Sequence, residues 1–533
     1  MSVFSNIYNL RHLMAATLLL PLLCACVADN DICEDITKPQ IANSNQFINL
    51  SIVVSSGNES ITRANPAGGE DGDGREAGTD LENIVNGITL ILYKINNGEG
   101  LNDLTDKDTI DFIQYYGVDL VDDYEYENED CKKEAVYTTG DQPLEGLDLA
   151  KTYRAIVVAN VDLTKEDFTV GKNVKEVLDH TSKVSPQLIF QNSNLGATAT
   201  DFVMSLESEE NTLVKFQDPE TTTSANGQII EKYKFDGIHI ERLAARIDFW
   251  AKGVSYDEDL EGYKYSVYDN NGESNDYFVL TAVMPFNLYD GDEFLFKRIG
   301  DSSAKNYLAS ENNMEDNVVI DPNTFKKADV PPTKDGVVSI PDYMNSSYWL
   351  DNIIDKDIDK ELKDLPHMTM SGVQDNKQWG KAKSEYKEGT ITGDNIIVGY
   401  AKENTLPINS PLFYYATGLR IEGDYYKYND GEETKEHLVY YGFLRHKGEG
   451  YAQGDTYYPM WSKEDLKKYK EGTLEDKQQK LLNGSPMNFG VVRNNIYRIS
   501  IDKIKKRGEE QPEITWKIMV KNWDVFEHKT IFM

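Results

Sequence analysis

The sequence predicts a protein dominated by β-structure, and three observations support this fold class. The 533 residues include 32 tyrosines, a residue type that favours strands over helices. Several segments alternate apolar and polar residues, whereas the 3.6-residue periodicity of amphipathic helices is scarce. The hydrophobic fraction of 40%, with 11% aromatic residues, is higher than a disordered acidic chain carries. We therefore expect an all-β-dominated chain of two or three domains with a few short helices.

The amino terminus has the pattern of an export signal. Its apolar run, Leu13–Ala25, is too short to span a bilayer as a helix and is typical of a signal peptide, which we place at residues 1–25. The sequence Leu23-Cys24-Ala25-Cys26 resembles the lipobox of bacterial lipoproteins, so Cys26 is expected to become the lipid-bearing first residue. Cleavage nearby without lipid attachment is the alternative. No later segment is apolar enough to cross a membrane.

The first predicted strand is followed by a long polar loop. Residues 47–54 (FINLSIVV) alternate in polarity, which predicts a half-buried strand. Its apolar face consists of Ile48, Leu50, Ile52 and Val54. Residues 55–79 are rich in Gly, Ser, Asn, Asp and Pro, and we expect them to form an exposed loop that is open to proteolysis. Arg63 and Arg75 lie within this loop.

Further strands are predicted at residues 88–95 (ITLILYKI) and 153–159 (YRAIVVA), with acidic turns between them. The second of these segments is almost continuously apolar, which indicates a central strand. Residues 174–181 and 361–365 are the best candidates for short helices. The character of the chain changes near Asp236-Gly237, so we place a domain boundary there.

The second half of the chain begins with a long strand pattern and continues as hairpins. Residues 238–249 alternate in polarity and predict one strand at the start of the second domain. Residues 263–268 precede an Asn-Asn-Gly turn, and residues 413–428 precede an Asp-Gly turn and a partner strand at 438–444. We expect both to be strand-turn-strand units.

Composition and motifs argue against most chemical functions. With 55 Lys plus Arg and 90 Asp plus Glu, the net charge is −35, so nucleic acid is not an expected partner. The seven histidines have no metal-binding spacing, and the chain lacks a G-x-S-x-G elbow and a phosphate loop. We therefore predict no enzyme activity, no metal and no cofactor. Outside the leader only Cys33 and Cys131 remain, and a single possible bridge is not a disulfide scaffold.

The tyrosine-dense region at residues 414–461 permits two interpretations. Tyrosines at hairpin positions commonly pack against each other with their phenolic ends in water. If the rings are exposed instead, they could stack on sugars. Packing is the simpler expectation, and a glycan-binding face is the alternative.

Short motifs at four places in the chain carry a resemblance to a known family. Near the carboxy terminus the chain reads FGVVRNNIYRISI at 489–501, then Ile504-Lys505-Lys506-Arg507-Gly508 and Val520-Lys521-Asn522-Trp523. The lipobox at Cys26, the sequence SITRA at 60–64 and the sequence ERLAAR at 241–246 agree with it. In these places the chain resembles the type V fimbrillins, the stalk pilins of Bacteroidales-type bacteria.

The resemblance implies a fold and a sequence of export, cleavage and assembly. It implies two β-sandwich-like domains of transthyretin-like or Greek-key type, at residues 64–236 and 237–533. It also implies export as an outer-membrane lipoprotein and cleavage between Arg63 and Ala64 by an Arg-specific protease, which would remove residues 26–63. The product would polymerise by strand exchange with other copies and related fimbrial subunits, and would bind host or bacterial surface ligands. Whether the subunit is stalk, tip or anchor is left open.

Hydrophobic patterning supports strand exchange independently. On a strand near the carboxy terminus, alternation is repeated by Ile514, Trp516, Ile518 and Val520, with Trp523 in the tail beyond. This set matches the apolar face of the first strand, so one strand could replace the other in the same groove. We therefore predict donor strands at residues 514–533. The alternative is that both segments are ordinary sheet strands that never leave.

Two functions follow from these patterns. The first is a structural, non-enzymatic subunit of a surface fimbria that serves adhesion or biofilm formation. The second is an outer-membrane surface lipoprotein that binds glycans through its tyrosine-rich face. Arg63 separates them, because a binding lipoprotein needs its amino-terminal tether intact whereas a polymerising subunit should lose it.

Overall fold

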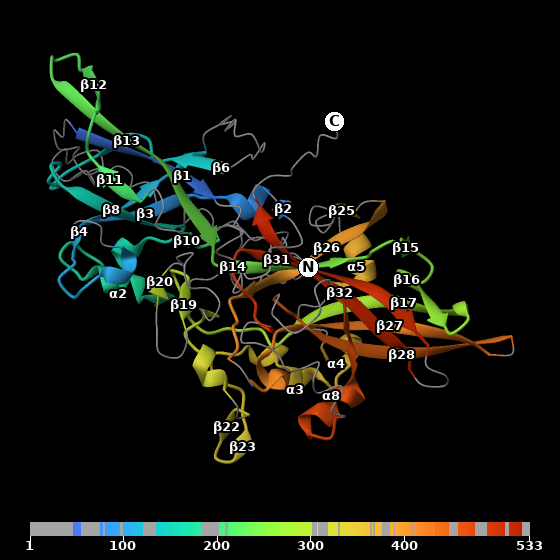
Figure 1. Ribbon diagram of the computed structural model, residues 1–533. Helices are drawn as coiled ribbons and strands as arrows, with labels where there is room; N and C mark the ends of the chain where they lie inside the picture. Colours follow the sequence, from blue (N-terminus) through green and yellow to red (C-terminus); the bar gives the residue numbers. More distant parts are fainter. Residues whose placement is uncertain are drawn as a thin grey trace, which may run out of the picture.

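The computed structural model confirms the predicted fold class, with most of its residues in strands (Figure 1). It describes residues 46–54, 75–77, 80–95, 100–120, 135–182, 202–207, 212–300, 306–307, 318–328, 331–362, 365, 368–375, 384–388, 390–407, 410–429, 431–446, 457–474, 488–506 and 511–524. Two large mixed sheets carry the architecture, as expected for β-sandwich-like domains. None of the helices in these ranges has the length and apolarity needed to cross a membrane.

The first sheet has the strand order β4-β3-β8-β10-β13-β1-β6-β5. Its strands are β1 (Gln46–Val54), β3 (Gly87–Lys94), β4 (Ile110–Gly117), β5 (Asp119–Leu120), β6 (Ala135–Thr138), β8 (Thr152–Ala159), β10 (Met204–Leu206) and β13 (Ile229–Arg242). Three short strands pair with this path: β7 (Gln142–Pro143) with β1, β11 (Leu213–Lys215) with β8, and β12 (Glu220–Thr223) with β13. Every residue of β8 after Thr152 is buried, which confirms that it is central.

The second sheet has the strand order β25-β26-β14-β31-β16-β17-β27-β28-β30. Its strands are β14 (Ala244–Trp250), β16 (Gly262–Asp269), β17 (Gly272–Phe286), β25 (Ser384–Glu388), β26 (Ile391–Lys402), β27 (Gly418–Asn429), β28 (Glu432–Phe443), β30 (Trp461–Ser462) and β31 (Asn495–Lys505). The last strand, β32 (Glu513–Asp524), pairs with β31, β29 (Tyr457–Pro459) and β2 (Arg75–Ala77). Two more short strands, β15 (Tyr256–Asp257) and β24 (Met368–Thr369), attach to β16 and β17.

Small sheets and short helices fill the connections. The small sheets are β9 (Thr181–Ser182) with β18 (Glu293–Phe294), β19 (Arg298–Gly300) with β20 (Asn306–Tyr307) and β21 (Val318–Ile320), and β22 (Thr333–Lys334) with β23 (Val337–Val338). The α-helices are α2 (Val174–Leu178), α3 (Leu350–Ile353), α4 (Ile358–Glu361), α5 (Met370–Asp375), α7 (Leu412–Tyr415) and α8 (Lys463–Lys470). The 3₁₀ turns are η1 (Asp80–Asn83), η2 (Leu101–Asp103), η3 (Leu163–Lys165), η4 (Thr324–Lys327) and η5 (Ser346–Tyr348).

Most of the elements predicted from the sequence are present, with three corrections. The pattern at 238–249 is not one strand, because β13 ends in the first sheet and β14 begins in the second, with Leu243 between them. The expected domain boundary near 236–237 lies within β13, a few residues before Leu243, and it stays a prediction. Residues 413–415 belong to the short helix α7 rather than to the following strand, and the helix expected at 361–365 is α4, which ends at Glu361.

Strand β32 closes the core of the second sheet. Trp516 of this strand is 1% exposed, and Ile514 and Ile518 are also buried. A Cβ atom on Gly442 of β28 would lie 1.9 Å from the Trp516 ring, so the glycine lets the backbone of β28 approach the indole directly. The last long strand of the chain is therefore packed into the core of its own domain.

We predict that Gly442→Val lowers the free energy of unfolding by roughly 1–3 kcal/mol, because the new side chain must displace the Trp516 ring in a close-packed core. Denaturant titration of the purified protein measures this change. The matched control is Gly117→Val in β4, where an added Cβ would meet only the Asn86 carbonyl oxygen, at 4.0 Å. Equal effects of the two substitutions would show that the contact with Trp516 does not constrain β28.

Candidate functional site

The first predicted strand, β1, is inserted between two groups of strands in the first sheet. On one side it runs parallel to β13, with a register from Gln46 opposite Glu231 to Val54 opposite Ile240. On the other side it pairs antiparallel with β6 and β7. We call the gap that β1 occupies, between β13 and β6 with β7, the β1 slot.

The side chains of β1 divide as the sequence predicted. The four residues of the apolar face are all fully buried; they are Ile48, Leu50, Ile52 and Val54. Their burial is worth roughly 6–12 kcal/mol, at about 1.5–3 kcal/mol for each side chain. That is comparable with the whole stability of a domain. An empty slot would therefore favour any strand of matching pattern.

Polar contacts fix the register of β1 within its slot. The Leu50 N–H donates to Thr139 Oγ1 at 3.1 Å, and the Thr139 N–H donates to the Leu50 carbonyl at 3.2 Å. At the outer face, Thr138 Oγ1 donates to Asn49 Oδ1 at 2.7 Å. Gln46 Nε2 donates to Glu231 Oε2 at 3.0 Å. Main-chain and side-chain bonds on both flanks thus select one alignment.

β1 connects two parts of the first sheet. Among the described strands, β6 and β7 are hydrogen-bonded to the rest of the first sheet only through β1, and β5 is bonded only to β6. Removal of β1 would therefore cut the sheet in two and expose the edges of β13 and β6. Sequence reasoning missed these flanking strands, because it expected acidic turns there. The apolar pair Val136-Tyr137 was the available signal.

A buried network of charged side chains lies just beyond the end of β13, at the start of the second sheet. Asp248 in β14 accepts two bonds of 2.9 Å from the Arg246 guanidinium and one of 3.0 Å from Arg498 Nη2 in β31. Arg246 Nη1 also contacts Glu82 Oε2 at 3.0 Å. All four side chains are at most 3% exposed. Such a network stabilises only if its partners are all in place, so it fixes their relative positions.

Arg242, the last residue of β13, extends this network to the first domain. Its Nε donates to the Glu82 carbonyl at 3.0 Å, and its Nη1 donates to Asn494 Oδ1 at 3.1 Å. Its Nη2 donates to Asn83 Oδ1. The motifs 241–246 and 489–501, which were singled out in the sequence, therefore meet at the passage between the sheets.

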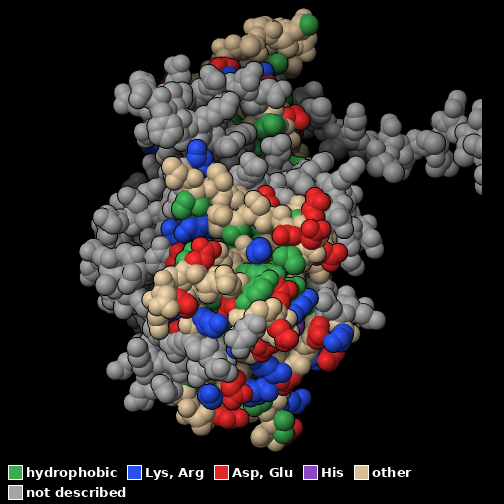
Figure 2. Space-filling model, turned by 90° about the vertical axis from the view of Figure 1, so that its right-hand side faces the viewer, with side chains coloured by type: hydrophobic (Ala, Val, Ile, Leu, Met, Phe, Trp, Pro, Cys, Tyr) green, Lys and Arg blue, Asp and Glu red, His purple; other side chains and the backbone are tan. Residues whose placement is uncertain are grey.

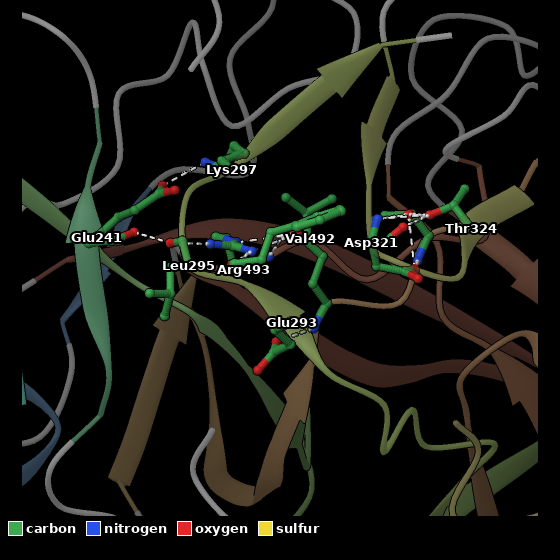
Figure 3. Close-up of polar contacts among 12 residues, drawn as sticks. Glu241, Glu293, Leu295, Lys297, Asp321, Thr324, Val492 and Arg493 are labelled. Atoms are coloured by element: carbon green, nitrogen blue, oxygen red, sulfur yellow. Dashed lines mark hydrogen bonds and ion pairs between the residues drawn. The ribbon is translucent and has the colours of Figure 1, made fainter. Parts of the chain in front are cut away.

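A second buried cluster adjoins the first (Figure 3). Arg493 donates to Glu403 Oε2 at 2.9 Å through Nη2 and to the Leu295 carbonyl at 3.2 Å through Nη1. Lys297 Nζ donates to Glu241 Oε2 at 2.5 Å, and both side chains are fully buried. The segment around Leu295 is thus held between the end of β13 and the turn before β31.

Burial shifts the pKa values of carboxyl groups in this region in different directions. Desolvation raises the pKa of Glu241 to about 7, against the opposing charges of Lys297 and Arg493. Desolvation also raises the pKa of Glu293 to about 7. For Asp248 desolvation is again the largest effect, but Arg246 and Arg498 together outweigh it and lower the pKa. The junction therefore holds carboxyl groups that titrate near neutral pH beside one that stays charged.

The other sequence-predicted site residues lie in different places. Cys26, Arg63 and Ala64 are outside the described residues, as are Cys33 and Cys131. The predicted donor residues Ile514, Trp516 and Ile518 are buried in β32, and Val520 packs partly buried against the same core. Trp523 is a residue of β32, and residues 525–533 are outside the described residues. The structure therefore does not place β32 in the β1 slot of its own chain.

The tyrosine-dense segment divides between the two faces of the β27–β28 hairpin. Tyr425, Tyr440 and Tyr441 of the hairpin are buried, as are Tyr414 and Tyr415 of α7. On the outer face, Tyr426 stacks on Tyr277 of β17 with ring centroids 4.6 Å apart, and Tyr428 is 42% exposed. Figure 2 views the side toward which this hairpin points in Figure 1, and hydrophobic side chains lie there among interspersed acidic and basic ones.

In the described ranges, no three His, Cys, Asp or Glu side chains are grouped so that they could hold a metal ion. The buried polar residues of the junction were not predicted as site residues. The available signal was the density of arginine within otherwise apolar segments, at 241–246 and 491–498.

Comparison with known proteins gives one family match. Residues 449–527 match the family model for "Major fimbrial subunit protein type IV, Fimbrillin, C-terminal". The matched segment includes β31 and β32 and the motif FGVVRNNIYRISI. The resemblance to fimbrillins is thereby confirmed, but the matching family is described as type IV, whereas the motifs resembled type V. No curated protein matches the chain.

Three solved structures are similar over most of the chain. One is a candidate cell adhesion protein from Parabacteroides distasonis, with 13% identity and a TM-score of 0.37, covering 90% of this chain and 99% of that chain. Another is the tip fimbrial protein Mfa3 from Porphyromonas gingivalis with a C-terminal truncation, with 11% identity, a TM-score of 0.31 and coverage of 90% and 100%. A candidate cell adhesion protein from Bacteroides eggerthii has 10% identity, a TM-score of 0.31 and coverage of 90% and 96%.

We predict that the stability difference between the native protein and Glu293→Gln depends on pH. The pKa of Glu293 is raised from 4.5 to about 7 in the folded state. The contribution of this carboxyl group to the free energy of unfolding is therefore fully present below pH 4.5 and is lost as the pH rises through 7. The native protein should lose about 3 kcal/mol relative to the variant across this window.

Urea titrations between pH 4 and pH 8 measure this difference. The exposed-site variant Glu145→Gln controls for the loss of an acidic side chain. A pH-independent difference between the native protein and Glu293→Gln would contradict the raised pKa.

Proposed function

We propose that this chain, whose carboxy-terminal segment belongs to the fimbrillin family, is a structural subunit of a surface fimbria that polymerises by protease-triggered strand exchange. The fimbria would serve adhesion or biofilm formation, and the role of the subunit would be non-enzymatic. Its partners would be other copies, related fimbrial subunits and surface ligands of a host or of other bacteria.

The observation that carries this proposal is the insertion of β1. A strand with four fully buried side chains lies at the amino-terminal end of the described chain and alone joins β6 and β7 to the first sheet. Arg63 follows it within the polar segment that joins β1 to β2. A cut there would separate β1 covalently from the rest of the chain, and the slot could then accept a strand from a neighbouring subunit.

The precursor would be held at the outer membrane until this cut is made. The lipid on Cys26 would precede β1, so the tether and the slot strand would share the removed segment, residues 26–63. Loss of the tether and opening of the slot would then be a single event. An Arg-specific protease would control both the release of the subunit from the membrane and its ability to polymerise.

The donor strand would come from near the carboxy terminus, where there are two candidate segments, β32 and residues 525–533. They differ in how much packing the donor subunit would lose. Withdrawal of β32 would expose Trp516 and remove one partner strand of β31, so the donor domain would lose apolar burial of the same kind that the slot regains. A donor segment at residues 525–533 would leave β32 paired with β31. We therefore infer that the segment after β32 enters the neighbouring slot, while β32 remains in its own sheet.

A second candidate function is glycan binding, and the outer face of the β27–β28 hairpin favours it. Tyr277, Tyr426 and Tyr428 cluster there, and Lys264 Nζ lies 4.0 Å from the centroid of the Tyr277 ring. Aromatic rings beside polar groups are suited to sugar contacts. A surface lipoprotein of this kind would keep its amino-terminal tether.

We predict that subunits in sheared surface filaments begin at Ala64, because cleavage follows Arg63 and frees β1. Amino-terminal sequencing measures this directly. Arg63→Ala should leave the protein as a membrane-bound monomer. The control is Arg75→Ala, at the arginine that the sequence predicts to lie in the same loop and that begins β2 in the structure. Filaments whose subunits begin at Cys26 would contradict the cleavage scheme. A surface protein that keeps Cys26 and forms no filaments would favour the glycan-binding lipoprotein.

We predict that deletion of residues 525–533 abolishes polymer but leaves a folded, exported monomer, because β32 still completes its own core. Deletion of residues 513–533 should instead unfold the second domain by exposing the partners of Trp516. Cell fractionation and circular dichroism separate the two results. Normal filaments from the shorter deletion would show that residues 525–533 do not enter a neighbour.

A further inference from the structure

A fully buried lysine lies against a carboxamide and a carboxylate, away from the β1 slot. Lys327 in η4 places Nζ 2.7 Å from Asn404 Oδ1, which follows β26, and 2.7 Å from Asp321 Oδ2, which follows β21. A third contact, of 3.2 Å, joins Nζ to the Thr405 carbonyl. The Lys327 side chain is 0% exposed and that of Asp321 is 1% exposed. Figure 3 shows Asp321 and Thr324 at this place.

The surrounding contacts hold the carboxamide in one orientation. Asn404 Nδ2 donates to the Tyr415 carbonyl and to Thr417 Oγ1, both at 2.8 Å, so Oδ1 is the atom turned toward Lys327. The Asn404 backbone exchanges two hydrogen bonds with Val491, of 2.9 and 2.8 Å. The amide carbon is one C=O bond beyond Oδ1, so the amine would have to shift from Oδ1 to this carbon while these contacts hold Asn404 in place.

The carboxylate is held as firmly as the carboxamide. Asp321 Oδ2 accepts from the Thr405 N–H at 2.8 Å, and Oδ1 accepts from the Asn323 N–H at 2.8 Å. The ring of Tyr289, which is 1% exposed, covers the amine, with Nζ 4.6 Å from the ring centroid. The site is therefore dry, rigid and closed, which is the condition under which neighbouring groups react at very high effective concentration.

We propose that Lys327 and Asn404 form an intramolecular amide cross-link, with Asp321 as the residue that accepts and returns the proton. This is a covalent modification of the chain itself and needs no cofactor or oxidant. It does not depend on strand exchange, because none of the three residues lies in the β1 slot or in β32.

The reaction balances with ammonia as the only released product. Lys327 first gives one proton to Asp321 Oδ2, which leaves a neutral amine with a free electron pair. Nζ then forms a bond to Asn404 Cγ while the C=O electrons move to Oδ1. When the carbonyl re-forms, the Cγ–Nδ2 bond breaks. The nitrogen that leaves takes up the proton held by Asp321, and the attacking amine then passes its second proton to Asp321. One ammonia departs for one amide bond formed, and Asp321 ends in its neutral, protonated form.

Burial favours the neutral forms that this chemistry requires. Desolvation lowers the pKa of Lys327, with the charge of Asp321 opposing it. Transfer of the proton from Lys327 to Asp321 converts a buried ion pair into a buried neutral pair, which costs less in a dry site. An unprotonated amine is the nucleophilic form of lysine.

A second buried lysine provides an internal comparison. Lys297 is also fully buried and contacts Glu241 Oε2 at 2.5 Å, yet its contacts in the described structure include no carboxamide. Burial and an ion pair are thus common to both lysines, whereas the amide electrophile is present only beside Lys327. A cross-link would join residues 77 positions apart and would tie the excursion between β17 and β26 to the end of β26.

Peptide mapping of the purified mature protein by mass spectrometry tests this inference. A protease that cleaves after lysine should yield a branched peptide that joins Lys327 to Asn404 and lacks one ammonia, and no peptide should end at Lys327. Cleavage after Lys297 should proceed normally in the same digest. Two linear peptides, one that ends at Lys327 and one that contains unmodified Asn404, would overturn the proposal.

Two variants test the roles of the individual groups. Lys327→Met should abolish the branched peptide. Asp321→Asn keeps the shape but cannot accept the proton, so at least a tenfold fall in cross-linked peptide is expected while circular dichroism is unchanged. The matched control is Glu241→Gln, which removes the carboxylate beside the other buried lysine and should leave the cross-link intact. Full cross-linking in Asp321→Asn would remove Asp321 from the mechanism.

Discussion

One carboxylate, Asp248, holds together parts of the chain that are far apart in sequence. It accepts hydrogen bonds from Arg246 beside it and from Arg498, which is 250 residues away. Because Asp248 and both arginines are buried, loss of any one of them would leave an unpaired charge in a dry environment. The course of β14 beside β31, and with it the direction in which β13 enters the first domain, depends on this contact.

That constraint matters most for the β1 slot. If β1 leaves, the edge of β13 loses its parallel partner along most of its length. The far end of β13 would still be held, because Arg242 is bonded to the Glu82 carbonyl and to Asn494, and Glu241 is bonded to Lys297. A slot with one wall fixed to the second domain can keep its register while it is empty, which strand exchange requires. The motifs that carry the family resemblance therefore support the slot without lining it.

Sequence patterning predicted the strands that alternate and failed where burial has no periodic signal. Ile48, Leu50, Ile52 and Val54 are buried as their spacing indicated, and the hairpins around Asn271 and Gly431 form with antiparallel register. The passage between the sheets at Leu243 was missed, because β13 and β14 are both buried there and the apolar pattern runs on without a break. A two-residue period cannot report that a chain has changed sheets.

The buried charges were hidden from sequence reasoning for a different reason. Arg493, Arg498 and Asp248 would ordinarily be assigned to the surface, because charged residues are rarely buried without partners. Their partners lie on distant strands, so no local pattern could reveal the pairing. The same holds for Lys327, Asp321 and Asn404, whose approach depends on the end of β26 meeting η4.

The two parts of the molecule would carry load differently in a filament. Tension would enter the first sheet through the strand in the β1 slot, where hydrogen bonds on both flanks share it along the strand. It would leave through the end of β32, whose neighbours β31 and β29 pair with it antiparallel. Between these points the chain crosses at Leu243, where the continuous backbone is supported by the buried ion pairs of the junction and by apolar contacts such as that of Phe202 with Tyr400. The charged contacts are dry, so they would weaken abruptly if one partner were displaced and water entered. The arginines of the junction therefore resist separation of the two sheets only while all of their partners stay in place.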